Sequence, residues 1–109
     1  AKREMLGVAQ DTLLHHGAVS EAVVREMVEG ALRHSHAQVA LALSGIAGPT
    51  GGSADKPVGT VWFAWGIKGG TCVARLHYLS GNRAEIRAQS VRIALQGVVD
   101  FLNQLTETV

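Results

Sequence analysis

Hydrophobic residues in the first third of the chain recur with the period of an α-helix. After Ser20, which suits a helix N-cap, the apolar positions up to about His34 keep the spacing i, i+3, i+4 and i+7: Val24, Met27, Val28, Ala31 and Leu32. The charged residues of this segment fall mostly on the other face. A shorter helix is expected ahead of it, capped by Asp11 and stopped by Gly17. The pattern predicts two consecutive helices.

The last part of the chain shows the same period. Asn82 and Glu85 have the spacing of a capping box, in which each side chain bonds the backbone N–H of the other residue. The apolar positions that follow hold the helical repeat: Val91, Ala94, Leu95, Val98, Leu102 and Leu105. A long helix is therefore expected to close the chain.

Three runs between these helices have the composition of β-strands. Val39 to Leu43 is continuously apolar, which is typical of a strand covered on both faces in the middle of a sheet. Val58 to Ile67 and Thr71 to Leu79 are joined by Lys68-Gly69-Gly70, which predicts an antiparallel hairpin. The order of elements predicts the α/β class, with a mixed sheet that contains this hairpin and has helices packed on both faces.

Composition narrows the function classes. A length of 109 residues with 47% hydrophobic content fits one packed domain. Ten basic and nine acidic side chains nearly cancel, so no global charge favours nucleic acid or a membrane surface. The chain has no membrane-length apolar stretch and no signal-peptide pattern. Its single cysteine, Cys72, fits a small buried side chain in a reduced, cytoplasmic compartment.

The most informative segment is a glycine-rich loop that directly follows the first strand. It reads Ser44-Gly45-Ile46-Ala47-Gly48-Pro49-Thr50-Gly51-Gly52. Ligands of helix-flanked sheets bind at the carboxyl ends of strands, and glycines let backbone N–H groups approach one anionic or carbonyl oxygen. The glycine-rich loop is not followed by the Gly-Lys-Ser/Thr of a Walker motif, nor by the helix that follows a dinucleotide-binding fingerprint. Composition alone favours a flexible connection, whereas the position after a buried strand favours a binding loop, so both interpretations stay open.

Two arginines open the last helix. Arg83 and Arg87 are four residues apart and therefore share a helix face. Beside the N–H groups of the helix start they could hold a phosphate or a carboxylate. A cation at this end opposes the helix dipole, which hints at a role other than helix stability. An ordinary pair of surface arginines, with Glu85 and Asp100 as companions, is the alternative.

Other chemically active residues suggest less. His34 and His36 have i, i+2 spacing at a helix end and cannot both face one ion, so we expect no metal and no cofactor. Strand alternation puts Trp62 on one face and Phe63 with Trp65 on the other, which favours core packing over a base-stacking platform. Lys2, near the terminus, gives no signal by itself.

Several strings, taken together and in order, resemble the C-terminal domain of the bacterial CinA family. They are Ala1-Lys2 with Met5-Leu6-Gly7-Val8, His16-Gly17-Ala18-Val19-Ser20-Glu21, Ser44-Gly45-Ile46-Ala47-Gly48-Pro49 with Gly51-Gly52, Lys56-Pro57-Val58-Gly59-Thr60-Val61, and Gly81-Asn82-Arg83 with Ile86-Arg87. Each string alone is weak, but the ordered set covers most of the chain.

The resemblance implies a fold, an activity and a site. The fold is a three-layer α/β/α sandwich on a mixed sheet. The activity is hydrolysis of the carboxamide of nicotinamide mononucleotide to nicotinate mononucleotide and ammonia, in pyridine-nucleotide recycling. Lys2 matches a lysine that acts as general base toward a serine nucleophile. Ser44, Gly45 and the loop would hold the carboxamide end. Arg83 would meet the phosphate, with Arg87 on the same helix face.

One departure from the family concerns the nucleophile. The family's serine lies in a Glu-Ser-Cys-Thr-Gly-Gly-like string, and no such string occurs in this sequence. We therefore expect residues 1–109 to be an amidase-type domain without its N-terminal segment, inactive alone, with that segment adding a strand and a helix to the sheet. Alternatives are a nucleotide-binding relative without catalysis and a purely structural one. A homodimer through the apolar hairpin is also plausible.

Overall fold

The computed structural model describes residues 8–107, with side chains described to Gln104. The described elements are α2 (Gln10–His16), α3 (Glu21–Arg33), β1 (Val39–Gly45), β2 (Thr60–Ile67), β3 (Cys72–Tyr78) and α4 (Arg83–Glu107). Their order agrees with the helices and strands expected from the sequence. No helix within residues 8–107 is long and apolar enough to cross a membrane.

The three strands form one antiparallel sheet in the order β1-β2-β3. Leu43 pairs with Phe63 across the first ladder, and Phe63 pairs with Arg75 across the second. The predicted hairpin between β2 and β3 is confirmed. The expected mixed sheet is not what the described strands form, because β1 also runs antiparallel to β2. A loop, rather than a crossover helix, returns the chain between them, and only a crossover would make them parallel.

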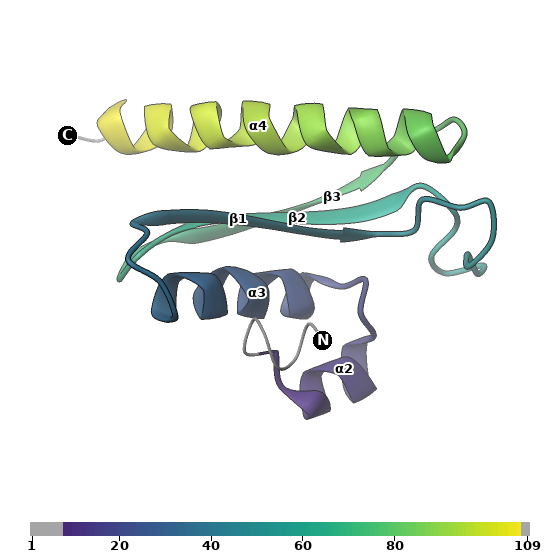
Figure 1. Cartoon of the computed structure of the whole chain (residues 1–109), viewed down its shortest axis with the longest axis horizontal. Helices are drawn as coiled ribbons and strands as arrows, with labels where there is room; N and C mark the ends of the chain where they lie inside the picture. Colours follow the sequence, from purple (N-terminus) through teal and green to yellow (C-terminus); the bar gives the residue numbers. More distant parts are fainter. Residues whose placement is uncertain (1–7, 108–109) are drawn as a thin grey trace.

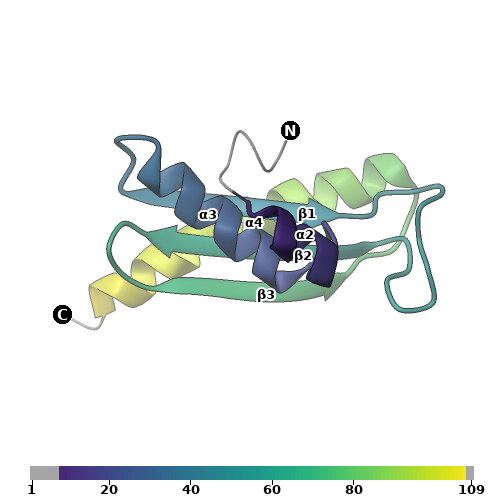
Figure 2. The ribbon, with the colours of Figure 1, turned by 90° about the horizontal axis from the view of Figure 1, so that it is seen from below.

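Helices cover both faces of this sheet. Figure 1 shows α4 along one face and α3 along the other, so the described elements make three layers and the α/β class is confirmed. Seen from the α3 side, α3 lies across the strands while α4 runs obliquely behind them (Figure 2). Strand β2 is central, whereas β1, predicted to lie in the middle, is an edge strand of the described sheet.

Strand alternation divides the core into two clusters. On the α3 side, Val24 and Val28 pack with Ala64, and Trp62 lies partly buried beside them. On the α4 side, Phe63 and Trp65 pack with helix residues that include Ile86, Ala94 and Phe101. The predicted separation of Trp62 from Phe63 and Trp65 is confirmed. Burying apolar area at about 25 cal/mol per Å² on both faces holds the layers together.

Local capping signals place the helix starts. The Ser20 hydroxyl accepts a hydrogen bond from the Val23 N–H at 3.3 Å. Asn82 and Glu85 form the predicted reciprocal box, with both N–H to side-chain oxygen distances at 2.9 Å. The expected Asp11 cap is wrong: the N-cap of α2 is Ala9, so Asp11 lies in the first turn of the helix and no side chain caps α2.

Candidate functional site

The glycine-rich loop between β1 and β2 is an ordered structure. The Ile46 N–H donates to the Thr60 carbonyl at 2.9 Å, and the Gly59 N–H donates to the Ile46 carbonyl at 2.7 Å, which extends the ladder beyond the strand ends. Farther out, the Ser53 N–H donates to the Lys56 carbonyl at 3.0 Å. The Lys56 ammonium in turn donates to the His16 carbonyl at 3.0 Å, which ties the loop to the end of α2. The flexible-connection alternative is therefore disfavoured.

Part of the loop backbone is available to a ligand. Gly48 adopts φ 83°, and a Cβ there would come within 2.7 Å of a Val58 methyl carbon. Only glycine fits this position without strain. Gly51 and Gly52 are exposed. Within the described part of the chain, their N–H groups and that of Ala47 make no hydrogen bond. These donors could bind an oxygen that carries negative charge.

Arg83 connects this loop to the start of α4. Its guanidinium donates to the Gly48 carbonyl at 3.1 Å. The capping box formed by Asn82 and Glu85 sets the direction in which α4 leaves the loop. The structure thus brings two features of the sequence, 35 positions apart, into direct contact.

A cavity of about 250 Å³ lies where the loop, β1 and α4 meet. Its lining comprises Leu43, Gly45, Ala47, Val61, Arg83, Ile86, Arg87, Ser90 and Val91. The floor is apolar, and the two guanidiniums add to the positive end of the α4 dipole. The only carboxylate in this turn, Glu85, accepts the bond from the Asn82 N–H. The cavity therefore favours an anionic group. We call it the loop cavity.

Ser90 is a lining residue that the sequence did not indicate. Its side chain is buried, and its hydroxyl donates to the Ile86 carbonyl at 2.8 Å, as serines inside helices commonly do. Ser90 follows Arg83 and Arg87 at helical spacing, so the sequence could have predicted that it lies on the same helix face.

Ser44 does not lie in this cavity. Residues 44 and 45 are adjacent in β1, so their side positions point to opposite faces of the sheet. Gly45 lines the loop cavity under α4, whereas the buried Ser44 hydroxyl donates to the Ala18 carbonyl at 2.9 Å on the α3 side. Ser44 thus fastens the α2–α3 connection to the strand tip.

The other predicted residues fall into three groups. Ala47 lines the loop cavity, and Gly48 contacts Arg83 at its rim. The half-buried Ile46 extends the ladder. A Cβ built on Gly51 would lie 3.7 Å from a methyl carbon of the Ile46 side chain, so Gly51 lies beside it. Lys2 lies outside the described residues. Across residues 8–107 no group of three histidine, cysteine or acidic side chains could hold a metal ion.

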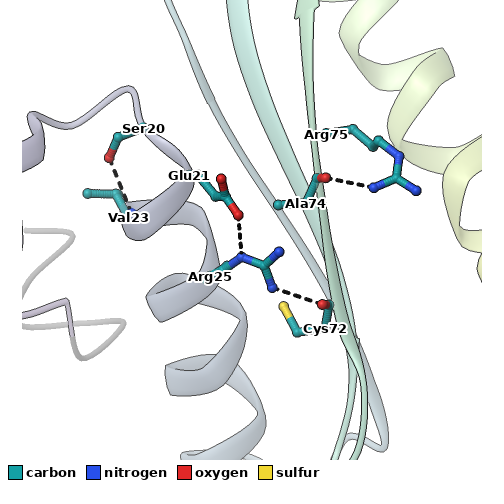
Figure 3. A network of polar contacts seen from close by, with 7 residues as sticks. All are labelled: Ser20, Glu21, Val23, Arg25, Cys72, Ala74 and Arg75. Carbon is teal, nitrogen blue, oxygen red and sulfur yellow. Dashed lines mark hydrogen bonds and ion pairs between the residues drawn. The ribbon is translucent and has the colours of Figure 1, made fainter.

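Cys72 lies on the α3 side of the sheet, away from the loop cavity. Burial raises the pKa of its thiol above the ordinary value, and the neighbouring Arg25 guanidinium partly opposes this rise. Figure 3 shows Arg25 bridging Glu21 and the Cys72 carbonyl, both at 2.8 Å. A thiol with a raised pKa carries little thiolate at neutral pH, so it is a poor nucleophile.

Comparison with known proteins gives consistent matches along the chain. Residues 1–102 match the model of the CinA C-terminal domain. The nicotinamide-nucleotide amidohydrolase PncC of Escherichia coli (strain K12) is 52% identical over 96 residues, which are 88% of this chain and 58% of that protein. A CinA-like protein of Akkermansia muciniphila is 50% identical over 100 residues, which are 92% of this chain and 24% of that protein.

Solved structures share the fold. The competence/damage-inducible protein of Agrobacterium tumefaciens superposes with a TM-score of 0.87 at 45% identity, covering 91% of this chain and 61% of that one. A CinA superfamily protein of Klebsiella pneumoniae gives 0.89 at 42% identity, covering 94% of this chain and 64% of that one. The chain spans less than two thirds of the length of these relatives.

Proposed function

Because the chain belongs to the CinA C-terminal domain family, we propose that its protein is an amidohydrolase acting on nicotinamide mononucleotide. Water and the carboxamide would give nicotinate mononucleotide and ammonia, in the recycling of pyridine nucleotides in the bacterial cytoplasm. The observation that carries the proposal is the contact of Arg83 with Gly48, which sets a cationic helix start beside a glycine loop with unused N–H donors. The amidohydrolase relative from Escherichia coli, 52% identical, supplies the reaction class.

The loop cavity suits one end of such a substrate. Its volume of about 250 Å³ is below the ~300–1,000 Å³ typical of complete small-molecule sites. We assign it the phosphate-bearing end, held by Arg83, Arg87 and the start of α4. The carboxamide would then lie against the loop backbone, where the N–H groups of Gly51 and Gly52 could stabilise the oxyanion.

The proposal also assigns the catalytic groups. A serine hydroxyl would attack the amide carbon, and an unprotonated Lys2 would take its proton and return it to the departing ammonia. Water then hydrolyses the acyl-enzyme. The serine would come from a segment outside this sequence, since no serine here has the family's sequence context. Ser44 would act by holding the strand tip in place through Ala18.

Two surfaces support the idea that a further segment completes the site. Within the described sheet, β1 pairs only with β2, so its outer edge has free backbone groups. On α4, four apolar side chains are exposed by between 41% and 60%: Val91, Leu95, Val99 and Leu102. They follow the helical repeat on the flank of the loop cavity. A strand and a helix placed there would bring a nucleophile to the loop. The exposed Leu76 and Tyr78 of β3 leave a homodimer as a separate possibility.

One observation favours a second candidate, nucleotide binding without catalysis. Ser44 and Ser90 are the serines next to or inside the loop cavity, and both hydroxyls donate to backbone carbonyls. Neither is free to act as a nucleophile. A relative that lacks the upstream serine would then bind the mononucleotide and leave it intact.

Ammonia release tests the proposal. We expect a longer form that contains the upstream segment to release ammonia from nicotinamide mononucleotide, and the 109-residue chain to release none. Activity of the 109-residue chain would contradict the assigned nucleophile. Calorimetry with nicotinamide and nicotinate mononucleotides separates the remaining cases: heat without ammonia in the longer form identifies a binding protein, and no heat identifies a structural one.

A further inference from the structure

A second cavity, larger than the loop cavity, lies on the other flank of α4. It has a volume of about 640 Å³ and lies between the second half of α4 and β3. It shares no lining residue with the loop cavity. We call it the β3 groove. The function proposed above does not use it.

The groove exists because α4 crosses the sheet obliquely (Figure 2). The helix packs on β1 and β2, whereas α3 packs across all three strands on the other face. The β3 side chains that face α4 are therefore left open. Val73, Arg75 and His77 pair across the ladder with Trp65, Phe63 and Val61, which places them on the α4 face.

A close contact at Gly97 sets the depth of the groove. A Cβ at this position would lie 2.1 Å from the Trp65 ring, so glycine lets α4 rest directly on the indole. The Trp65 N–H donates to the Ala94 carbonyl at 3.0 Å, which fixes the ring under the helix. The back of the groove is thus a rigid aromatic wall.

The floor is apolar, and Trp65 forms part of it. Beneath it, the fully buried Phe63 stacks on Trp65 with a centroid distance of 5.9 Å and an interplanar angle of 6°, so Phe63 supports the indole ring without lining the groove. His77 meets the same Phe63 ring edge-on, at 5.2 Å. Val73 and the buried Phe101 complete the apolar surface. Such a floor favours a planar, apolar ligand body.

The rim carries an excess of positive charge. Arg75 extends from β3 toward α4 (Figure 3), and Arg92 lines the groove from the helix. In the described part of the chain neither guanidinium has a carboxylate partner. Arg75 donates one hydrogen bond, to the Ala74 carbonyl at 2.9 Å, and Arg92 donates none within the described residues. Among the lining side chains that the structure describes, the one carboxylate is that of Asp100, which accepts a hydrogen bond from Gln96 at 3.0 Å. The unpaired guanidiniums are therefore available to an anion.

We propose that the β3 groove is a binding site for a small aromatic carboxylate. The ring would lie on the floor formed by Trp65, Val73 and Phe101, and the carboxylate would reach Arg75 and Arg92. The cavity volume falls within the ~300–1,000 Å³ range of small-molecule sites.

The experiment compares 1-naphthoate with 1-naphthamide, which has the same ring system without the charge. Titration of the full chain, followed by calorimetry and by NMR of the Trp65 indole N–H, should show naphthoate binding at least tenfold more tightly than naphthamide. The Trp65 signal should shift, and that of Gly51 should stay unchanged.

Paired variants locate the site. The double substitution Arg75→Gln and Arg92→Gln, at exposed positions that leave the core intact, should reduce naphthoate affinity to that of naphthamide. The matched control, Arg83→Gln with Arg87→Gln on the other flank, should leave it unchanged. Equal affinity for the two ligands, shifts confined to the glycine loop, or no binding would each overturn the proposal. So would sedimentation that shows two copies of the chain closing the groove.

Discussion

The two flanks of α4 offer a comparison of how one helix can serve two cavities. Both cavities have an apolar floor from the sheet and two arginines at the rim. On the loop flank, Arg83 already donates to the Gly48 carbonyl, so its guanidinium is positioned before any ligand arrives. On the β3 flank, Arg75 donates only to the carbonyl of its neighbour Ala74, and Arg92 makes no hydrogen bond within the described residues, so neither is tied to another element. A cation held between two elements suits catalysis, which requires fixed geometry, whereas cations without such a tie suit simple binding.

The difference comes from what supports each flank. The loop flank is built from backbone: the extended ladder at Ile46, the positive φ of Gly48 and the capping box at Asn82. The β3 flank is built from side chains: Trp65, Val73 and Phe101 line it, and the buried Phe63 supports the Trp65 ring from beneath. Backbone donors remain through many side-chain substitutions, and only positions that fix the loop conformation, such as Gly48, resist change. Side-chain sites can change one residue at a time.

The largest effect should follow from removing the positioned cation. In a longer, active form of the protein, Arg83→Gln should reduce kcat/KM for ammonia release by about 10- to 100-fold, because a hydrogen bond to a charged group contributes about 1.5–3 kcal/mol. Steady-state ammonia assays measure this. Arg33→Gln, which affects only an exposed pair with Glu29, is the control. An unchanged kcat/KM in Arg83→Gln would contradict the proposal that Arg83 binds the phosphate of the substrate.

A substitution at Gly97 should disrupt the packing of α4 on the sheet. Gly97→Ala should lower the free energy of unfolding by about 1–3 kcal/mol, since the added methyl meets the Trp65 ring and the core has no room for it. Urea denaturation measures the loss, with Ala88→Ser on the exposed side of α4 as the matched control. The variant should also alter naphthoate binding, while the Arg83–Gly48 contact stays intact. Wild-type stability would show that α4 does not rest on the indole.

The smallest effect should come from the cap of α4. Asn82→Ala removes the acceptor for the Glu85 N–H and should cost about 1 kcal/mol of stability. Because the cap sets the approach of α4 to the loop, KM for the mononucleotide should rise more than kcat falls. Naphthoate affinity at the β3 groove should not change. Asn82→Asp, which keeps a capping oxygen, should restore stability; a loss equal to that of alanine would argue against the capping role.

Much of the fold was predictable because its signals are local. Helical periods, the Ser20 cap and the box at Asn82 depend on residues within four positions of each other. Alternation along β2 separated Trp62 from Trp65 for the same reason. The glycine loop and Arg83 were each visible as motifs. Their approach to one another was an expectation taken from family resemblance, and the structure supports it with the Arg83–Gly48 contact.

The sequence by itself determined the class of fold, the capped helices and a loop able to present backbone donors, because neighbouring residues decide these features. Only the tertiary structure decided that β1 lies at the edge of the described sheet, that Ser44 faces α3 while Gly45 faces α4, and that a groove opens over β3. The reason is that contacts between distant residues set these features: strand pairing places β1, the Ser44–Ala18 hydrogen bond fastens the strand tip on the α3 side, and the close approach of Gly97 to Trp65 seats α4 obliquely over the sheet (Figure 2). No local pattern records such an angle.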